Sequence, residues 1–187
     1  MSAFEAPPAA EVPRAAIRHL PEFILRELRS DHAGELGAVW IYRGVLAVAR
    51  DPELRAFAEA HMAAEQSHLD FFLTELPPAW HSRLAPLWRI AGFVLGALPA
   101  LFGPRAVYRT IAAVEAFVDE HYQVQIDMLE GRARYEWLRE RLIEFRADEL
   151  HHRDDALDRF GADAGGGLWR WIVHNGSVAG AVLARRI

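Results

Sequence analysis

Two copies of a pattern that could bind metal occur in the sequence, one in each half. In each copy a single glutamate is followed, 30 or 34 residues later, by the motif Glu-x-x-His. The members are Glu35, Glu65 and His68 in the first half and Glu115, Glu149 and His152 in the second. Carboxylate and imidazole groups in this order are the ligands with which four-helix bundles hold two iron or manganese ions.

The Glu-x-x-His spacing places both side chains on one face of a helix. Residues three positions apart are neighbours about one turn apart, so both can reach the same ion. A single Glu-x-x-His motif occurs by chance in many proteins, and a lone glutamate is more commonly exposed or a helix cap. The repetition of six residues in the same order and helical phase is more specific, and it predicts two related halves.

The six residues fall between apolar residues, on helix faces that must point into the core. Burial of an unpaired carboxylate costs several kcal/mol, so four such groups need positive charge between them. The sequence contains no lysine, and no arginine falls at the same level of these faces. Two divalent cations would balance the four carboxylates, and oxygen and nitrogen ligands suit iron or manganese better than structural zinc.

Four long helices are predicted to carry these residues. Ser30 or Asp31 is a suitable N-cap for the first, and Asp51 followed by proline marks the start of the second. The expected ranges are 30–50, 51–75, 104–130 and 132–160. No segment shows strand-type alternation of polar and apolar residues. We therefore expect an all-α fold: a four-helix bundle with an apolar helical insertion between its second and third helices and an additional C-terminal helix over 168–187.

Residues 84–103 differ in character from the four helices. They are almost wholly apolar, with Arg89 as the only charged residue, and they contain two prolines and three glycines. Their length is near the lower limit for a membrane span, but the prolines argue against one. We expect an arm in the membrane interface; a buried core helix or an oligomer interface is the alternative. The candidates for contact with a membrane or a substrate tail are Trp88, Phe93, Leu95 and Phe102.

Five further residues lie close in sequence to the ligand candidates and could hydrogen-bond to them, as metal ligands commonly require. Two tyrosines each follow a lone glutamate by seven residues, two helical turns, although both could equally be core aromatics. A histidine lies one turn before the first Glu-x-x-His, and an aspartate and another histidine follow the second lone glutamate. These residues are Tyr42, Tyr122, His61, Asp119 and His121.

The length and composition of the chain limit the number of domains it can form and the kinds of partner it can bind. A chain of 187 residues suits one domain, which we place at 22–187 after a flexible, proline-containing arm at 1–21. The net charge of −5 gives no general attraction to nucleic acid. The absence of cysteine excludes disulfides and thiolate metal sites, and we expect no secretory signal in the polar N-terminal segment.

The sequence resembles the demethoxyubiquinone hydroxylase family, the di-iron monooxygenases of ubiquinone biosynthesis. The resemblance extends from about residue 22 to the C-terminus, with the motifs in the family's order. The motifs are Asp31-His32-Ala33-Gly34-Glu35, Glu65-x-x-His68, Pro86-Leu87-Trp88, Ala91-Gly92-Phe93-x-Leu95-Gly96-Ala97, Val114-Glu115, His121-Tyr122 and Phe145-Arg146 leading into Glu149-x-x-His152. The apolar stretch adds most specificity, because proteins that share only the ligand pattern need not carry it.

The resemblance implies a ferritin-like fold and O₂-dependent hydroxylation of the ring of a polyprenylated demethoxy-quinol. It implies that the six ligand candidates hold two iron ions, with Glu65 and Glu149 as the bridging pair, and that NADH supplies electrons. The implied partners are the quinol, O₂, a membrane surface and other proteins of ubiquinone biosynthesis, and a homo-oligomer is also compatible. The expected location is peripheral, on the cytoplasmic face of a bacterial inner membrane or the equivalent matrix face of an organelle.

Two other kinds of function are compatible with the residues. A different ferritin-like protein could use the same ligands for iron storage, peroxide scavenging or hydroxylation of another substrate. The apolar stretch argues against a storage cage, and the acidic net charge argues against an RNA substrate. A non-enzymatic helical scaffold could instead bind lipid or protein through the apolar segment.

Overall fold

The computed structural model describes residues 17–161 and 167–187, and every regular element in these ranges is helical, which confirms the all-α class. The helices are α1 (Glu22–Val48), α2 (Pro52–Glu75), α3 (Ala85–Ala100), α4 (Pro104–Leu129), α5 (Glu136–Phe160) and α6 (Leu168–Ala184). Short 3-10 turns occur at Ile17–His19, Pro78–Trp80 and Ala133–Tyr135.

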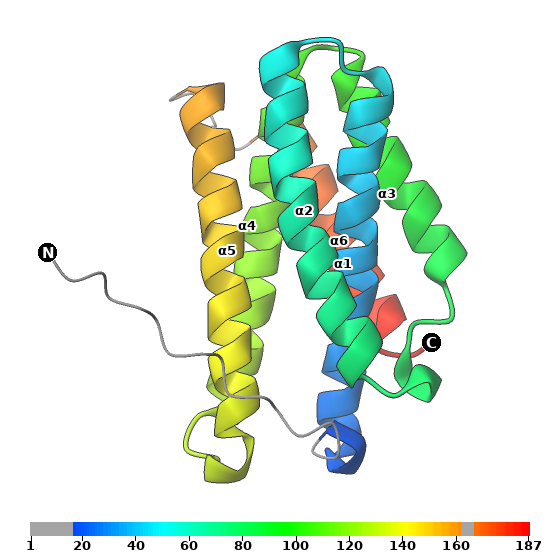
Figure 1. Cartoon of the computed structure of the whole chain (residues 1–187), viewed down its shortest axis with the longest axis vertical. Coiled ribbons are helices and arrows are strands. Elements are labelled where there is room, and N and C mark those ends of the chain that lie inside the picture. The colour runs from blue at the N-terminus through cyan, green and yellow to red at the C-terminus, as the bar shows by residue number, and fades with distance from the viewer. Residues whose placement is uncertain (1–16, 162–166) are drawn as a thin grey trace, which may run out of the picture.

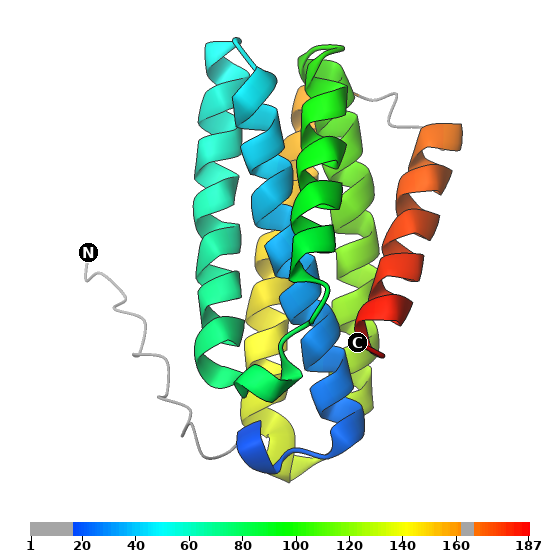
Figure 2. The same ribbon diagram turned by 90° about the vertical axis from the view of Figure 1, so that its right-hand side faces the viewer.

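Four of the helices form a bundle, and the other two cover one side of it. α1 pairs with α2, and α4 pairs with α5, as two hairpins that lie side by side (Figure 1). α3 packs along α1, and α6 lies against α4 and α1 (Figure 2). The predicted insertion and the predicted C-terminal helix therefore both lie on the side formed by α1 and α4.

The helix boundaries follow local signals, but two predicted starts differ from the structure. α5 begins at Glu136, after the 3-10 turn Ala133–Tyr135, and not at residue 132. The Asp51 side chain accepts a hydrogen bond from the Leu54 N–H (2.8 Å) at the start of α2, as expected. α1, however, begins at Glu22 and not near Ser30, and both Ser30 and Asp31 are buried inside it. The prediction relied on the capping preference of serine and aspartate. Pro21, at the N-cap position, is the signal that marks the actual start.

The predicted flexible arm at 1–21 is described only in part. Residues 1–16 lie outside the described residues. Ile17 and Leu20 are buried in an apolar cluster with Ile24 and Leu28, so this last part of the predicted arm is packed. The packed region thus begins before the predicted boundary at residue 22.

The bundle core consists of two apolar clusters with a polar layer between them. One cluster includes Tyr42 and Ile111, and the other includes Leu28 and Leu142. On each bundle helix the ligand candidates lie between residues of the first cluster and residues of the second. Close apolar packing at both ends thus places six polar side chains in a buried middle layer.

α3 approaches α1 closely because glycines line the contact. A methyl group on Gly96 would overlap the carbonyl of Ile41, and one on Gly92 would overlap the carbonyl of Gly37. The opposite face of α3 is exposed, and Ile90 there is 65% accessible. The alternative of a buried helix therefore applies to one face of α3, the face that packs against α1, while the other face is exposed. None of the described helices combines the length and the apolar character that crossing a bilayer would require.

Candidate metal centre

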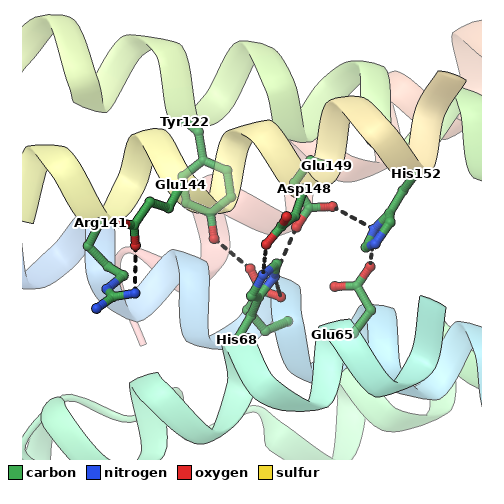
Figure 3. Close-up of polar contacts among 9 residues, drawn as sticks. Glu65, His68, Tyr122, Arg141, Glu144, Asp148, Glu149 and His152 are labelled. Carbon is green, nitrogen blue, oxygen red and sulfur yellow. Dashed lines mark hydrogen bonds and ion pairs between the residues drawn. The ribbon is translucent and has the colours of Figure 1, made fainter. Parts of the chain in front are cut away.

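The six predicted ligands converge in the middle of the bundle, and each is between 1% and 4% exposed. Glu65 and His68 on α2 face Glu149 and His152 on α5 (Figure 3). The residues form two overlapping groups, in each of which the candidate ligand atoms all lie within 4.8 Å of one another. The groups are Glu35, Glu65, His68 and Glu149, and Glu65, Glu115, Glu149 and His152.

Glu65 and Glu149 belong to both groups. Two carboxylates shared in this way are placed to bridge two ions. Each group takes its remaining glutamate and histidine from one half of the sequence: Glu35 with His68, and Glu115 with His152. The twofold repeat of the sequence is therefore also present in space.

Several atoms of this layer are buried without a hydrogen-bond partner among the described residues. They include Oε2 of Glu35, Oε1 of Glu65 and of Glu149, and Nδ1 of His68 and of His152. The two Nδ1 atoms lie 3.2 Å from Glu149 and 3.1 Å from Glu65, but without hydrogen-bond geometry. A buried polar atom left unpaired costs roughly 1–3 kcal/mol. The residues therefore fit divalent cations placed between them.

In the absence of a cation, this layer must hold protons. Burial, followed by repulsion from Glu149, raises the pKa of Glu65 to about 8 and the pKa of Glu115 well above its usual value. Burial alone would lower the pKa of His68 and His152, but contacts with carboxylates, Glu149 first, raise these values to about 12 and about 10. Metal ions would have to displace these protons.

We expect the metal-free protein to lose stability as the pH rises from about 6.5 to about 9. Glu65 has a pKa of about 8 in the folded state against an ordinary value of 4.5, so the folded protein binds more protons in this window. The free energy of unfolding therefore falls with rising pH. His68 and His152 act in the same direction above pH 6.5.

Thermal unfolding followed by circular dichroism would test this pH dependence. The Tm of the metal-free protein should fall by several degrees across the window. The stabilisation that added metal provides should instead grow with pH, because the ligands must lose protons to bind. A Tm of the metal-free protein that rises from pH 6.5 to pH 8 would contradict a protonated layer.

Tyr122 and Asp148 hydrogen-bond to two of the ligand candidates (Figure 3). The Tyr122 hydroxyl donates to Oε1 of Glu35 at 2.5 Å, so it reaches the glutamate of the other half and not Glu115 of its own helix. Nε2 of His68 lies 3.1 Å from Oδ2 of Asp148. A carboxylate in this position orients a metal-binding imidazole and selects its tautomer.

Two more of the predicted neighbours lie beside His152. His61 is buried, its Nε2 lies 2.9 Å from Oδ2 of Asp155, and its ring packs edge-on against His152 with 4.4 Å between centroids. Tyr42 is fully buried and stacks on His61. Its hydroxyl has no hydrogen-bond partner among the described residues. Burial and the nearby carboxylates, Glu115 first, raise the pKa of Tyr42 well above its ordinary value.

The last two predicted neighbours have other partners. His121 lies 3.0 Å from Oδ1 of Asp31, which also accepts a hydrogen bond from Gln125 at 2.7 Å. The Asp119 carboxylate is paired with Arg146 and Arg153, at 2.6 and 3.2 Å. Its hydrogen bonds and ion pairs with the described residues thus include none of the ligand candidates, although it lies one turn from Glu115.

Sequence reasoning missed Asp31, Asp148 and Asp155 as partners of these histidines. Asp31 was interpreted as a helix cap. Asp155 follows His152 by three residues, so its position on that helix face was a usable signal. Asp148 immediately precedes Glu149, and its pairing with His68 depends on the packing of α5 against α2, which sequence spacing does not reveal.

An apolar cavity of about 590 Å³ connects the carboxylate layer to α3 and α6. The four candidate glutamates line it at one side, and small residues of α6 such as Gly176 and Gly180 line it at the other. Of the predicted membrane or tail contacts, Trp88 and Leu95 line this cavity. The remaining two do not line it and are exposed, Phe93 at 36% and Phe102 at 77%.

Comparison with known proteins identifies the family. A family model described as "Ubiquinone biosynthesis protein COQ7" matches residues 22–184. The chain is 41% identical over 138 residues to the NADPH-dependent 3-demethoxyubiquinone 3-hydroxylase, mitochondrial, of Mus musculus, a match that covers 71% of this chain and 63% of the relative. It is 42% identical over 132 residues to the 3-demethoxyubiquinol 3-hydroxylase of Rhodospirillum rubrum, covering 69% and 61%.

A third relative is matched over most of its length. The chain is 30% identical over 165 residues to the NADPH-dependent 3-demethoxyubiquinone 3-hydroxylase, mitochondrial, of Caenorhabditis elegans, covering 86% of this chain and 88% of the relative. The matches to the mouse and Rhodospirillum relatives span less than two thirds of those proteins. On the basis of these similarities the chain belongs to the ubiquinone biosynthesis protein COQ7 family.

Proposed function

We propose that this protein is a di-iron monooxygenase that hydroxylates the ring of a polyprenylated demethoxy-quinol with O₂ in ubiquinone biosynthesis. The observation that carries the proposal is the apolar cavity that ends at the carboxylate layer. A cavity of this kind suits an apolar ring and tail, and the oxygen and nitrogen donors beside it suit iron. The names of the mouse and Rhodospirillum relatives specify 3-hydroxylation of a 3-demethoxyubiquinone or 3-demethoxyubiquinol for those proteins.

The six converging side chains would hold the two iron ions, which when bound would supply the activation of O₂. The surrounding residues then hold the ligands in place. The Tyr122 hydroxyl fixes the orientation of Glu35, and Asp148 keeps the proton of His68 on Nε2, which leaves Nδ1 free for the metal. The apolar clusters above and below this layer keep bulk water out.

The quinol ring would enter the end of the cavity near the glutamates, and the first part of its tail would lie between α3 and α6. Each buried CH₂ group of the tail contributes about 0.8 kcal/mol to binding. The exposed apolar faces of α3 and α6, including Ile90 and Trp171, suit a peripheral position on a membrane, from which the quinol could enter. We place the protein on the cytoplasmic or matrix face, as predicted from the sequence.

The electron donor and the protein partners are further proposals. The resemblance implies NADH, whereas the names of the mouse and Caenorhabditis relatives specify NADPH for those proteins. We propose a reduced nicotinamide nucleotide as the ultimate source of electrons here. Association with other ubiquinone-biosynthesis proteins and with a second copy of the chain stays a prediction.

Product analysis with the purified protein tests the reaction. After anaerobic reconstitution with Fe(II), reduced demethoxyubiquinone and ¹⁸O₂ should yield a product that carries one ¹⁸O atom in a new ring hydroxyl, detected by mass spectrometry. Failure to bind iron or manganese would exclude the proposed centre. Incorporation of oxygen from water, with none from O₂, would exclude a monooxygenase.

Filling the cavity should block the substrate and spare the metal. We expect Gly180→Leu, whose side chain would extend toward Trp88, to lower kcat/KM for the quinol about tenfold or more while iron content is unchanged. Ala179→Leu is the matched control, because Ala179 is the exposed neighbour on α6 and does not line the cavity. Equal activity in the two variants would contradict the proposed substrate path.

A further inference from the structure

We propose that the end of the molecule at which α4 and α6 begin binds the headgroup of an anionic phospholipid. A pocket of about 430 Å³ lies there, next to the cavity of the carboxylate layer. Arg105, Arg109 and Thr110 line one part of it, and Leu98, Phe102 and Trp169 line another. The pocket thus offers guanidinium groups to a phosphate and apolar side chains to the adjoining acyl chains.

Charge is distributed unevenly along the chain. Residues 76–114 and 164–187 contain no aspartate or glutamate, although they hold seven of the 21 arginines. All 26 acidic residues lie outside these two segments. The segments include α3, the start of α4 and α6, which lie on the same side of the bundle (Figure 2). This side is therefore basic and apolar in a protein whose net charge is −5.

The arginines at this end are not used in ion pairs within the described ranges. Arg105, Arg109 and Arg170 have no carboxylate within salt-bridge distance there, whereas arginines of α5 such as Arg141 and Arg159 do. The Arg105 guanidinium lies over the Phe160 ring at 5.6 Å. Arg109 and Arg170 also line an adjoining pocket of about 160 Å³. Basic groups from two helices therefore converge on one small region.

The N-termini of α4 and α6 lack the capping or acidic side chain that commonly accompanies the start of a helix. α4 and α6 begin after Gly103 and Gly167, with no side-chain cap and no acidic residue in the first turn. Each has an arginine in that turn instead, Arg105 and Arg170. Positive charge is unfavourable at the positive end of a helix dipole, whereas an anion there is favourable. A phosphate bound beside Arg105 would relieve the start of α4.

The apolar surroundings identify the anion as part of a lipid. Phe102 is 77% exposed, Leu168 is 73% exposed and Trp171 is 63% exposed around the arginines. A soluble phosphate gains nothing from these side chains, whereas a phospholipid at a membrane surface covers them with acyl chain. The inference rests on the membrane position proposed above, and it does not depend on the hydroxylation reaction.

Vesicle flotation of the metal-loaded full chain tests this site. Wild-type protein should bind vesicles of phosphatidylcholine with phosphatidylglycerol more tightly than vesicles of phosphatidylcholine alone. Arg105→Gln combined with Arg109→Gln should lower binding to the anionic vesicles about 25-fold, since each basic residue near such a surface is worth about fivefold. The control is Arg26→Gln with Arg134→Gln, two exposed arginines outside these basic segments, which should bind like wild type.

The outcomes separate this site from general charge effects and from the proposed reaction. Equal losses in both double variants, or equal wild-type binding to the two kinds of vesicle, would overturn the site. A rise in the Tm of the wild-type protein with inorganic phosphate alone, absent in the Arg105/Arg109 variant, together with equal wild-type binding to the two kinds of vesicle, would assign the site to free phosphate and overturn the lipid assignment. The Arg105/Arg109 variant should keep its iron and its hydroxylation of a short-tailed quinol in detergent. A wild-type protein that selects anionic vesicles but forms no product would exclude only the proposed reaction.

Discussion

Glu149→Gln should remove both metal positions and reduce hydroxylation about a thousandfold or more while the bundle stays folded. Glu149 is 1% exposed and contributes to both groups of converging ligand atoms. An amide of the same size carries no charge and offers one weaker oxygen, so neither ion keeps its shared carboxylate. The measurements are iron per chain by atomic spectroscopy, product formation, and circular dichroism as the test of folding.

Two further variants make this result specific. Glu35→Gln affects one group only, so it should retain about one tightly bound ion per chain where Glu149→Gln retains none. Glu144→Gln is the control on the same helix, because Glu144 is exposed and pairs with Arg141 at 2.6 Å. It should behave like wild type. If Glu149→Gln bound two ions and turned over normally, Glu149 would not be a ligand that the two metal positions share.

Gly96→Ala should destabilise the protein by about 1–3 kcal/mol or more, although it adds one methyl group. That methyl would overlap the carbonyl oxygen of Ile41 and lie 2.7 Å from its carbonyl carbon. Both atoms belong to the backbone of α1 and cannot move aside as a flexible side chain could. α3 must therefore shift away from α1, and because α3 also walls the cavity, quinol turnover should fall as well.

The control for this variant is Gly34→Ala on α1. A Cβ atom on Gly34 would meet nothing within 4 Å, and alanine favours a helix by up to about 1 kcal/mol over glycine. Its Tm should stay constant or rise, whereas the Tm of Gly96→Ala should fall by roughly 3 °C or more. A Gly96→Ala protein as stable as wild type would show that α3 is not locked against α1.

The positions of the helices and the residues on their inward faces could be predicted, because both depend on residues that are close in sequence. The periodic apolar residues, the Asp51 cap and the prolines after α2 correctly indicated the bundle helices. The start of α1 was predicted wrongly, because Ser30 has the local chemistry of a cap and yet lies buried within the helix. Local preference is weak against the burial of a whole helix face, which α1 gains when it extends back to Glu22.

Partners across helices could not be read from spacing. Tyr122 was placed on the stripe of Glu115, but its hydroxyl bonds to Glu35. Asp119 was a candidate neighbour of the ligands and instead pairs with Arg146 and Arg153. In each case the rotation and offset of a neighbouring helix select the partner. The same limit applies to Phe93, which shares α3 with the cavity-lining Trp88 but lies outside the cavity.

The sequence by itself determined the all-α class and the six residues that share inward helix faces. It did so because the 3.6-residue period sets the direction of every side chain relative to its own helix axis. The family resemblance already implied that Glu65 and Glu149 are the shared pair, which belongs to both groups of ligand candidates. Only the tertiary structure decided that Asp148 meets His68 and that a cavity joins these groups to α3 and α6. These features depend on the distances between helices, which side-chain packing across the whole core establishes.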